Sequence, residues 1–264
     1  MRDESTGTGA GTGTGAGTGA GTGDVVGGGA GAGGGAGAGG GAGAGGGAGA
    51  GGGAGAGGGA GADAAKGQWR VDEAPAPGLC AAVLAAAFAT EPVSGWICGD
   101  SERARRHWFA ATLATHATVP SARRHLLTDG TGHPVAAAVL TPPGAGPGAG
   151  AKAVWAVRTL LRCGPGPLIR TLRYLGGTAP AAPDGAWNLE FIGVLPEHTG
   201  RGAGRRLLDQ LLATAPAPGG GVHLTTADPS NVTIYERLGF TTHARLRIGP
   251  ITTTAMWRPA PPGE

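Results

Sequence analysis

The residues with the clearest chemical potential form a glycine-rich turn between an expected strand at 187–194 and an expected helix at 204–213. Three glycines stand at alternate positions in this turn, Gly200, Gly202 and Gly204. Glycine has no Cβ, so the backbone of such a turn can approach a ligand closely. The N–H groups at the start of the helix and the helix dipole both favour an anion. Positive charge is added by Arg201, Arg205 and Arg206. The turn therefore predicts a cradle for a diphosphate.

Two common phosphate-binding patterns do not fit this turn. It lacks the lysine of a P-loop, and arginine at 205 with leucine at 207 breaks the spacing of a dinucleotide-binding fingerprint. A glycine-rich turn that binds no ligand is the alternative interpretation. A second element weighs against that alternative: a strand at 222–226 leads into a short helix at 231–238. Asn231 is expected to cap this helix, which places Tyr235 one turn further on, and Gly239 ends it.

This order of elements resembles the GNAT superfamily of acetyl-CoA-dependent N-acetyltransferases, and within it the puromycin N-acetyltransferase-like group. The resemblance runs from about Gln68 to Pro259, and most of the matching motif residues lie from Trp187 onward. It rests on the glycine-rich turn, on Asn-x-x-x-Tyr-Glu-Arg-Leu-Gly-Phe at 231–240, and on Trp-x-Leu-x-x-x-Gly-Val-x-Pro-x-His at 187–198. The resemblance implies a GNAT fold and acetyl-CoA as co-substrate.

The resemblance also implies roles for individual residues. Tyr235 matches the general acid that protonates the leaving thiolate, Asn231 a cofactor contact, and Val194 the residue whose N–H faces the thioester carbonyl. The phosphate-binding turn falls on Thr199, Gly200, Arg201, Gly202, Ala203 and Gly204, with Arg205 beside it. Thr199 departs from the glutamine or arginine expected there, although the backbone donors remain.

The chemistry of acetyl transfer needs these parts and a base. Attack on a thioester creates an oxyanion that a fixed N–H stabilises, and the attacking amine must be neutral. Glu190 is the candidate base or water-positioning carboxylate, because an even number of residues separates it from Val194 and alternation puts both side chains on one face. A solvent-facing or salt-bridged glutamate is the alternative. No nucleophilic cysteine is required.

The remaining pattern predicts a mixed α/β domain at 67–260. Strands are expected at 68–71, 125–128, 134–140, 240–248 and 252–257, with a turn at 129–132. Helices are expected at 79–89, 101–115, 153–161 and 167–175, separated by loops at 142–150 and 176–185.

The first 66 residues have a different composition. The first 62 residues hold 33 of the 58 glycines, largely in a six-residue Gly/Ala repeat. Such a segment buries almost no side-chain area, so it is expected to be a disordered leader. A self-associating tail and a chain start downstream of the repeat are the alternatives.

Composition and residue spacing also limit the classes of partner and the cellular location that we expect. The net charge is +3 with dispersed arginine pairs, so nucleic-acid binding is not expected. No run approaches a membrane span, and no secretory signal is visible. Three cysteines without paired spacing indicate a reducing compartment, hence a cytoplasmic location, and no metal site is expected.

The function predicted from these observations is transfer of the acetyl group of acetyl-CoA to a primary amine of a small molecule. The expected helices at 153–175 would then shape its pocket. A protein N-acetyltransferase and a non-catalytic acyl-CoA-binding module are the alternatives. A homodimer is compatible with the sequence, which does not determine the oligomeric state.

Overall fold

A computed structural model describes residues 69–214 and 220–260 of the chain, and the predicted leader lies outside these ranges. The described strands form one seven-stranded sheet in the order β1-β2-β3-β4-β5-β7-β6. Their bounds are Arg70–Asp72 (β1), Arg123–Thr128 (β2), Pro134–Thr141 (β3), Trp187–Val194 (β4), Val222–Thr226 (β5), Thr241–Ile248 (β6) and Ile251–Arg258 (β7). The β4–β5 pair is parallel and the other pairs are antiparallel, so the predicted mixed sheet is confirmed.

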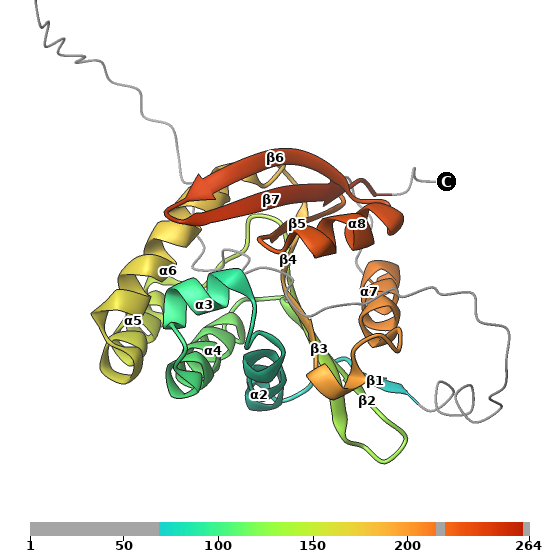
Figure 1. Ribbon diagram of the computed structural model, residues 1–264, viewed down its shortest axis with the longest axis horizontal. Helices are drawn as coiled ribbons and strands as arrows, with labels where there is room; N and C mark the ends of the chain where they lie inside the picture. The colour runs from blue at the N-terminus through green and yellow to red at the C-terminus, as the bar shows by residue number, and fades with distance from the viewer. Residues whose placement is uncertain (1–68, 215–219, 261–264) are drawn as a thin grey trace, which may run out of the picture. The chain divides into compact units, whose positions relative to one another are not determined.

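The helices lie in two layers on opposite faces of this sheet (Figure 1). The helices α2 to α6 cover one face, called the helical face below, and α7 and α8 cover the other. Their bounds are Pro77–Ala87 (α2), Pro92–Cys98 (α3), Glu102–His116 (α4), Ala149–Cys163 (α5), Pro165–Thr178 (α6), Ala203–Thr214 (α7) and Pro229–Arg237 (α8), with short 3-10 turns at Ala179–Ala181 and Pro196–His198.

Several boundaries differ from the sequence prediction because of how the helices begin. α2 begins at Pro77, two residues before the expected start at 79, because proline is well suited to the first turn of a helix. α3 was not predicted; Pro92 starts it, and the Glu91 side chain caps it by accepting the N–H of Ser94. α5 and α6 are longer than expected and shorten the loops on either side of them.

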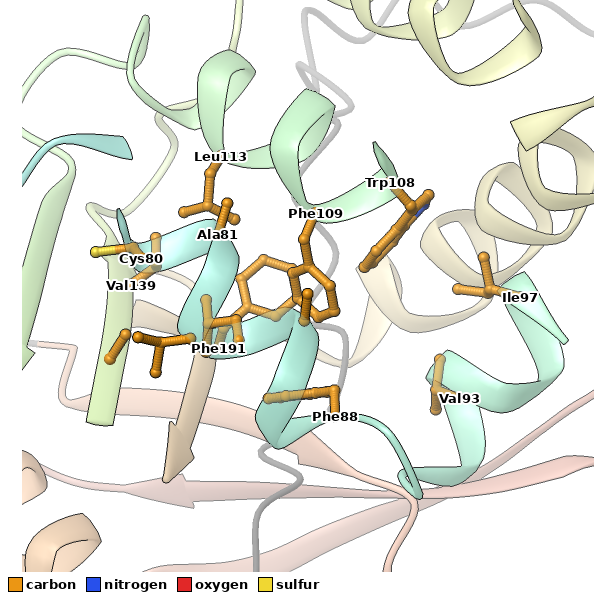
Figure 2. Close-up of a cluster of buried hydrophobic side chains, with 14 of the residues drawn as sticks. Cys80, Ala81, Phe88, Val93, Ile97, Trp108, Phe109, Leu113, Val139 and Phe191 are labelled. Carbon is orange, nitrogen blue, oxygen red and sulfur yellow. The ribbon is translucent and has the colours of Figure 1, made fainter. Parts of the chain in front are cut away.

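Aromatic side chains form the centre of the core on the helical face (Figure 2). Phe88, at the C-terminal cap of α2, and Phe109 of α4 pack edge to face with Phe191 of β4, with ring centroids 6.1 and 5.5 Å from it. Trp108 is also buried here, and its indole N–H donates to the Thr171 hydroxyl at 2.9 Å. This hydrogen bond joins α6 to α4, so α6 is part of the layer that covers the sheet.

On the opposite face, the leucines of α7 pack against the sheet as expected. Leu207, Leu208 and Leu211 are buried together with Val194 of β4 and Tyr235 of α8. This packing fixes the start of α7 beside the carboxyl end of β4 and brings α8 alongside. The tertiary structure thus places the two chemical motifs of the sequence on one face.

Three further properties concern the described residues only. No single described helix is long and apolar enough to cross a membrane; α2 and α3 together reach the length and hydropathy but meet at a 102° bend. No described group of three or more His, Cys, Asp or Glu could hold a metal ion. The three cysteines are free thiols, and Cys80 and Cys98 lie in the core.

Candidate active site

The site is organised around a gap between β4 and β5. The two strands pair only at Trp187 with Val222 and at Asn188 with His223. Beyond these pairs β4 continues to Val194 and β5 to Thr226 without pairing to each other. The carboxyl ends of both strands therefore border an opening in the middle of the sheet.

The backbone of Val194 points a hydrogen-bond donor into this gap. Leu195 N–H donates to the Val135 carbonyl on the β3 side at 2.9 Å, and the next pair along is Ala136 with Val194. Antiparallel pairs alternate between hydrogen-bonded and non-hydrogen-bonded, so the N–H of Val194 is turned away from β3. It is directed toward β5, where it can stabilise an oxyanion.

The glycine-rich turn has the conformation that an anion site needs. Gly200 and Gly202 have φ of +78° and +83°, and a Cβ built on Gly202 would meet no atom within 4 Å. The first intrahelical bond of α7 runs from Arg206 N–H to the Gly202 carbonyl at 3.0 Å. The N–H groups of Ala203, Gly204 and Arg205 consequently have no acceptor within the helix. They form the donor set that a diphosphate would use.

Side chains around this turn have different orientations. Arg205 is 74% exposed, with Nε 3.6 Å from a carboxylate oxygen of Asp209, so it remains accessible to a ligand. Arg206 instead donates to the Trp69 carbonyl at 3.4 Å. Arg201 and Thr199 are exposed, and the Thr199 hydroxyl donates to the Leu195 carbonyl at 3.4 Å.

Five of the eleven predicted site residues meet in one pocket, whereas Glu190 and the turn residues 199–203 do not line it. The pocket is lined by Ile192, Gly193, Val194, Gly204, Arg205, Leu208, Asn231, Ile234, Tyr235 and Leu238. Its volume is about 20 Å³, scarcely more than one water molecule occupies, so any larger ligand requires its walls to move apart. Sequence reasoning missed Gly193 and the apolar members other than Val194; the Ile-Gly-Val run that ends β4 could have indicated Ile192 and Gly193.

Tyr235 and Asn231 are both buried on α8. The Tyr235 ring packs against Phe240 with centroids 5.6 Å apart, and burial raises the pKa of its phenol well above the usual range. The phenol is therefore a proton donor at any physiological pH. The prediction that Asn231 caps α8 is wrong. Asp228 is the cap, accepting the Ser230 N–H at 2.9 Å, and Asn231 lies inside the helix, facing the pocket.

The predicted orientation of Glu190 is also wrong. The register between β3 and β4 passes from Val139–Phe191 to Leu140–Leu189, so Glu190 is the extra residue of a β-bulge. The bulge breaks alternation: Leu189 and Val194 lie in the same buried cluster although an odd number of residues separates them. Glu190 hydrogen-bonds Asn188, on the helical face, and is absent from the pocket that holds Val194 and Tyr235.

The environment of Glu190 favours its neutral form. The side chain is 1% exposed, and its Oε2 has no hydrogen-bond partner. Burial raises the pKa of the Glu190 carboxyl to about 8, although the hydrogen bond from Asn188 works in the opposite direction. A base role for Glu190 remains a prediction.

Comparison with known proteins agrees with this geometry. Residues 170–242, which contain the gap, the glycine-rich turn and α8, match the family model described as an acetyltransferase (GNAT) domain. A solved structure from Corynebacterium glutamicum ATCC 13032, titled histone acetyltransferase HPA2 and related acetyltransferase, is similar with a TM-score of 0.57 and 20% identity, over 74% of this chain and 98% of that one. The chain thus has the fold of the GNAT acetyltransferases.

Two further structures are similar at lower scores. The ribosomal-protein-S18-alanine N-acetyltransferase from Escherichia coli has a TM-score of 0.45 and 16% identity, over 74% of this chain and 96% of that one. The spermidine/spermine N-acetyltransferase SpeG from Vibrio cholerae has a TM-score of 0.40 and 14% identity, over 72% of this chain and 92% of that one.

Proposed function

We propose that this protein is an acetyl-CoA-dependent N-acetyltransferase whose acceptor is a primary amine of a small molecule. The observation that carries the proposal is the convergence of three parts on one pocket at the β4–β5 gap. These parts are the N-terminal donors of α7, the inward N–H of Val194 and the buried phenol of Tyr235. Each part matches one requirement of acyl transfer from a thioester bound through a diphosphate.

The proposed reaction is a direct attack. The amine nitrogen forms a bond to the thioester carbonyl carbon, and the oxyanion of the tetrahedral intermediate accepts a hydrogen bond from Val194 N–H. The C–S bond then breaks, and the thiolate takes a proton from the Tyr235 hydroxyl. Burial raises the pKa of Tyr235, so the phenol is protonated at neutral pH and carries the proton that the thiolate needs. No covalent enzyme intermediate forms.

A small acceptor is supported by how α6 covers the helical face. The Tyr174 hydroxyl lies 3.4 Å from the Thr225 hydroxyl of β5 and 3.5 Å from the Thr253 hydroxyl of β7. α6 therefore sits directly over the strands beside the gap, and α5 packs on α4 next to it (Figure 1). An extended polypeptide acceptor would need an open groove where this layer lies. The puromycin-like resemblance of the sequence points to the same class of acceptor.

The first test is release of free thiol from acetyl-CoA across a panel of primary amines that includes aminonucleosides, polyamines and peptide N-termini. We expect turnover with a small amine, and we expect calorimetry to detect heat when CoA binds. Preference for the peptides would favour a protein acceptor. Binding of CoA without turnover on any amine would favour a non-catalytic module, and absence of CoA binding would refute the site itself.

The second test is Tyr235→Phe, which removes the hydroxyl and keeps the ring packed on Phe240. Loss of a general acid typically lowers turnover by about 10²-fold or more. We expect that loss in thiol release, with the dissociation constant of CoA changed less than about threefold. Unchanged turnover in this variant would exclude Tyr235 as the proton donor.

A further inference from the structure

A second buried carboxylate, Glu91, lies on the other side of the β4–β5 gap. It belongs to the connection between α2 and α3, on the helical face, whereas Tyr235 approaches from the face covered by α7 and α8. Sequence analysis did not identify Glu91. Contacts on both of its sides fix its place.

Contacts of α2 place Glu91 beside the end of β4. A Cβ built on Gly193 would lie 2.8 Å from the Ala87 Cβ and 3.0 Å from the Phe88 ring, so the end of α2 packs directly on that glycine. Glu91 follows within one turn, and its N–H donates to the Phe88 carbonyl at 3.4 Å. Gly193 also lines the pocket that contains Tyr235, so the α2–α3 connection adjoins the reaction centre.

The charge of Asp228 and a groove lined by the neighbouring Pro92 place Glu91 near the end of β5. Asp228, two residues beyond β5, is near enough for its charge to act on the Glu91 carboxyl. Pro92 and Ala227 line one groove of about 640 Å³. Glu91 therefore lies between the two strand ends that border the gap, next to a groove large enough for a small molecule.

The Glu91 carboxyl has one oxygen in use and one without a partner. Oε2 accepts the Ser94 N–H at 2.7 Å and caps α3. Oε1 is buried without a hydrogen-bond partner, and the side chain is only 5% exposed. An unpaired buried acceptor is costly, and folded proteins seldom retain one without a role. Capping alone accounts for Oε2 and leaves Oε1 unexplained.

We propose that Glu91 binds the ammonium group of the acceptor through Oε1 and takes its proton, so that the neutral amine attacks the thioester. This inference rests on the proposed function and names the base of that reaction. One proton passes from nitrogen to Oε1 before attack and is later released to water. Once the C–N bond has formed and the C–S bond has broken, the nitrogen loses its second proton. That proton passes to the Tyr235 phenolate and restores the hydroxyl that protonated sulfur.

The protonation behaviour of Glu91 suits this step. Burial raises the pKa of its carboxyl to about 7, the N–H groups of Ser94 and Val93 work in the opposite direction, and the nearby Asp228 charge raises the pKa further. A base whose pKa lies near the working pH is both available and effective. Glu190, by contrast, is hydrogen-bonded to Asn188 at the bulge, away from the end of the gap.

The test uses Glu91→Gln, which retains an amide oxygen to cap α3 and cannot accept a proton. With an aminonucleoside acceptor in the full-length protein, we expect kcat/KM at pH 7 to fall about 10²-fold or more. We also expect the step near pH 7 to disappear from the pH profile of kcat/KM, while CoA affinity in calorimetry stays unchanged. Glu102→Gln, at an exposed position, is the matched control and should keep the step.

Glu91→Asp is the second variant, because aspartate is a good helix cap but is one methylene shorter. This variant should fold, bind CoA and show the same fall in kcat/KM, even if the glutamine variant does not fold. Wild-type rates and an intact pH step in either folded variant would overturn the proposal and leave Glu91 as a cap only. Failure of the proposed function itself is distinct: the wild-type protein would release no thiol with any amine.

Discussion

Replacing Glu190 by glutamine should stabilise the protein by an amount that grows with pH. Burial raises the pKa of this carboxyl from 4.5 to about 8. Above pH 4.5 the unfolded chain gives up the proton while the folded chain keeps it, so the stability present below pH 4.5 is lost as pH rises through about 8. Each unit of pKa difference corresponds to about 1.4 kcal/mol. Between pH 5 and pH 8 the loss attributable to Glu190 is therefore ~3 kcal/mol.

Urea unfolding followed by tryptophan fluorescence measures this effect in wild type and Glu190→Gln at both pH values. The variant's advantage in free energy of unfolding should increase by ~3 kcal/mol from pH 5 to pH 8. Comparison with wild type at each pH is essential, because burial lowers the pKa of His116 to about 4 and makes stability fall as pH decreases. Glu197→Gln, at an exposed position, controls for loss of one formal charge. An advantage that does not change with pH would refute the reasoning.

Substitutions at three glycines give further predictions. Gly202→Ala and Gly132→Ala are a matched pair, because both glycines have positive φ, +83° and +87°, and open space around an added Cβ. Each should lower the free energy of unfolding by ~1 kcal/mol, but only Gly202→Ala should weaken CoA binding in calorimetry; equal CoA affinities would show that the turn does not contact the diphosphate. Gly193→Ala should cost ~1–3 kcal/mol in urea unfolding and lower kcat/KM, because its Cβ would collide with α2; a neutral result would mean that α2 and Glu91 can shift without penalty.

Local patterns in the sequence were sufficient for most of the fold. The helix expected at 204–213 is α7, and the run from Asn231 to Phe240 predicted the helix that carries Tyr235. The glycine-rich turn was predicted from residue types alone, since positive φ at 200 and 202 is a property that glycine signals directly. These features depend on contacts between residues near each other in the chain.

The errors concern positions that distant parts of the chain determine. Alternation along β4 gave the wrong face for Glu190, because the strand bulges against β3, and nothing within β4 marks where that occurs. Asn231 and Asp228 are both good caps, and the choice between them depends on where β5 ends. The short helix α3, and with it the burial of Glu91, depends on packing between α2, α6 and the sheet.

By itself, the sequence determined the order of elements, the glycine-rich turn and the helix that carries Tyr235, because each is encoded in a few consecutive residues. Only the tertiary structure decided that β4 and β5 separate after two pairs, that Val194 N–H points into that opening, and which buried carboxylate lies beside it. The physical reason is that strand pairing and burial are set by contacts across long stretches of chain, and the charge state of a carboxyl follows from the burial that those contacts impose.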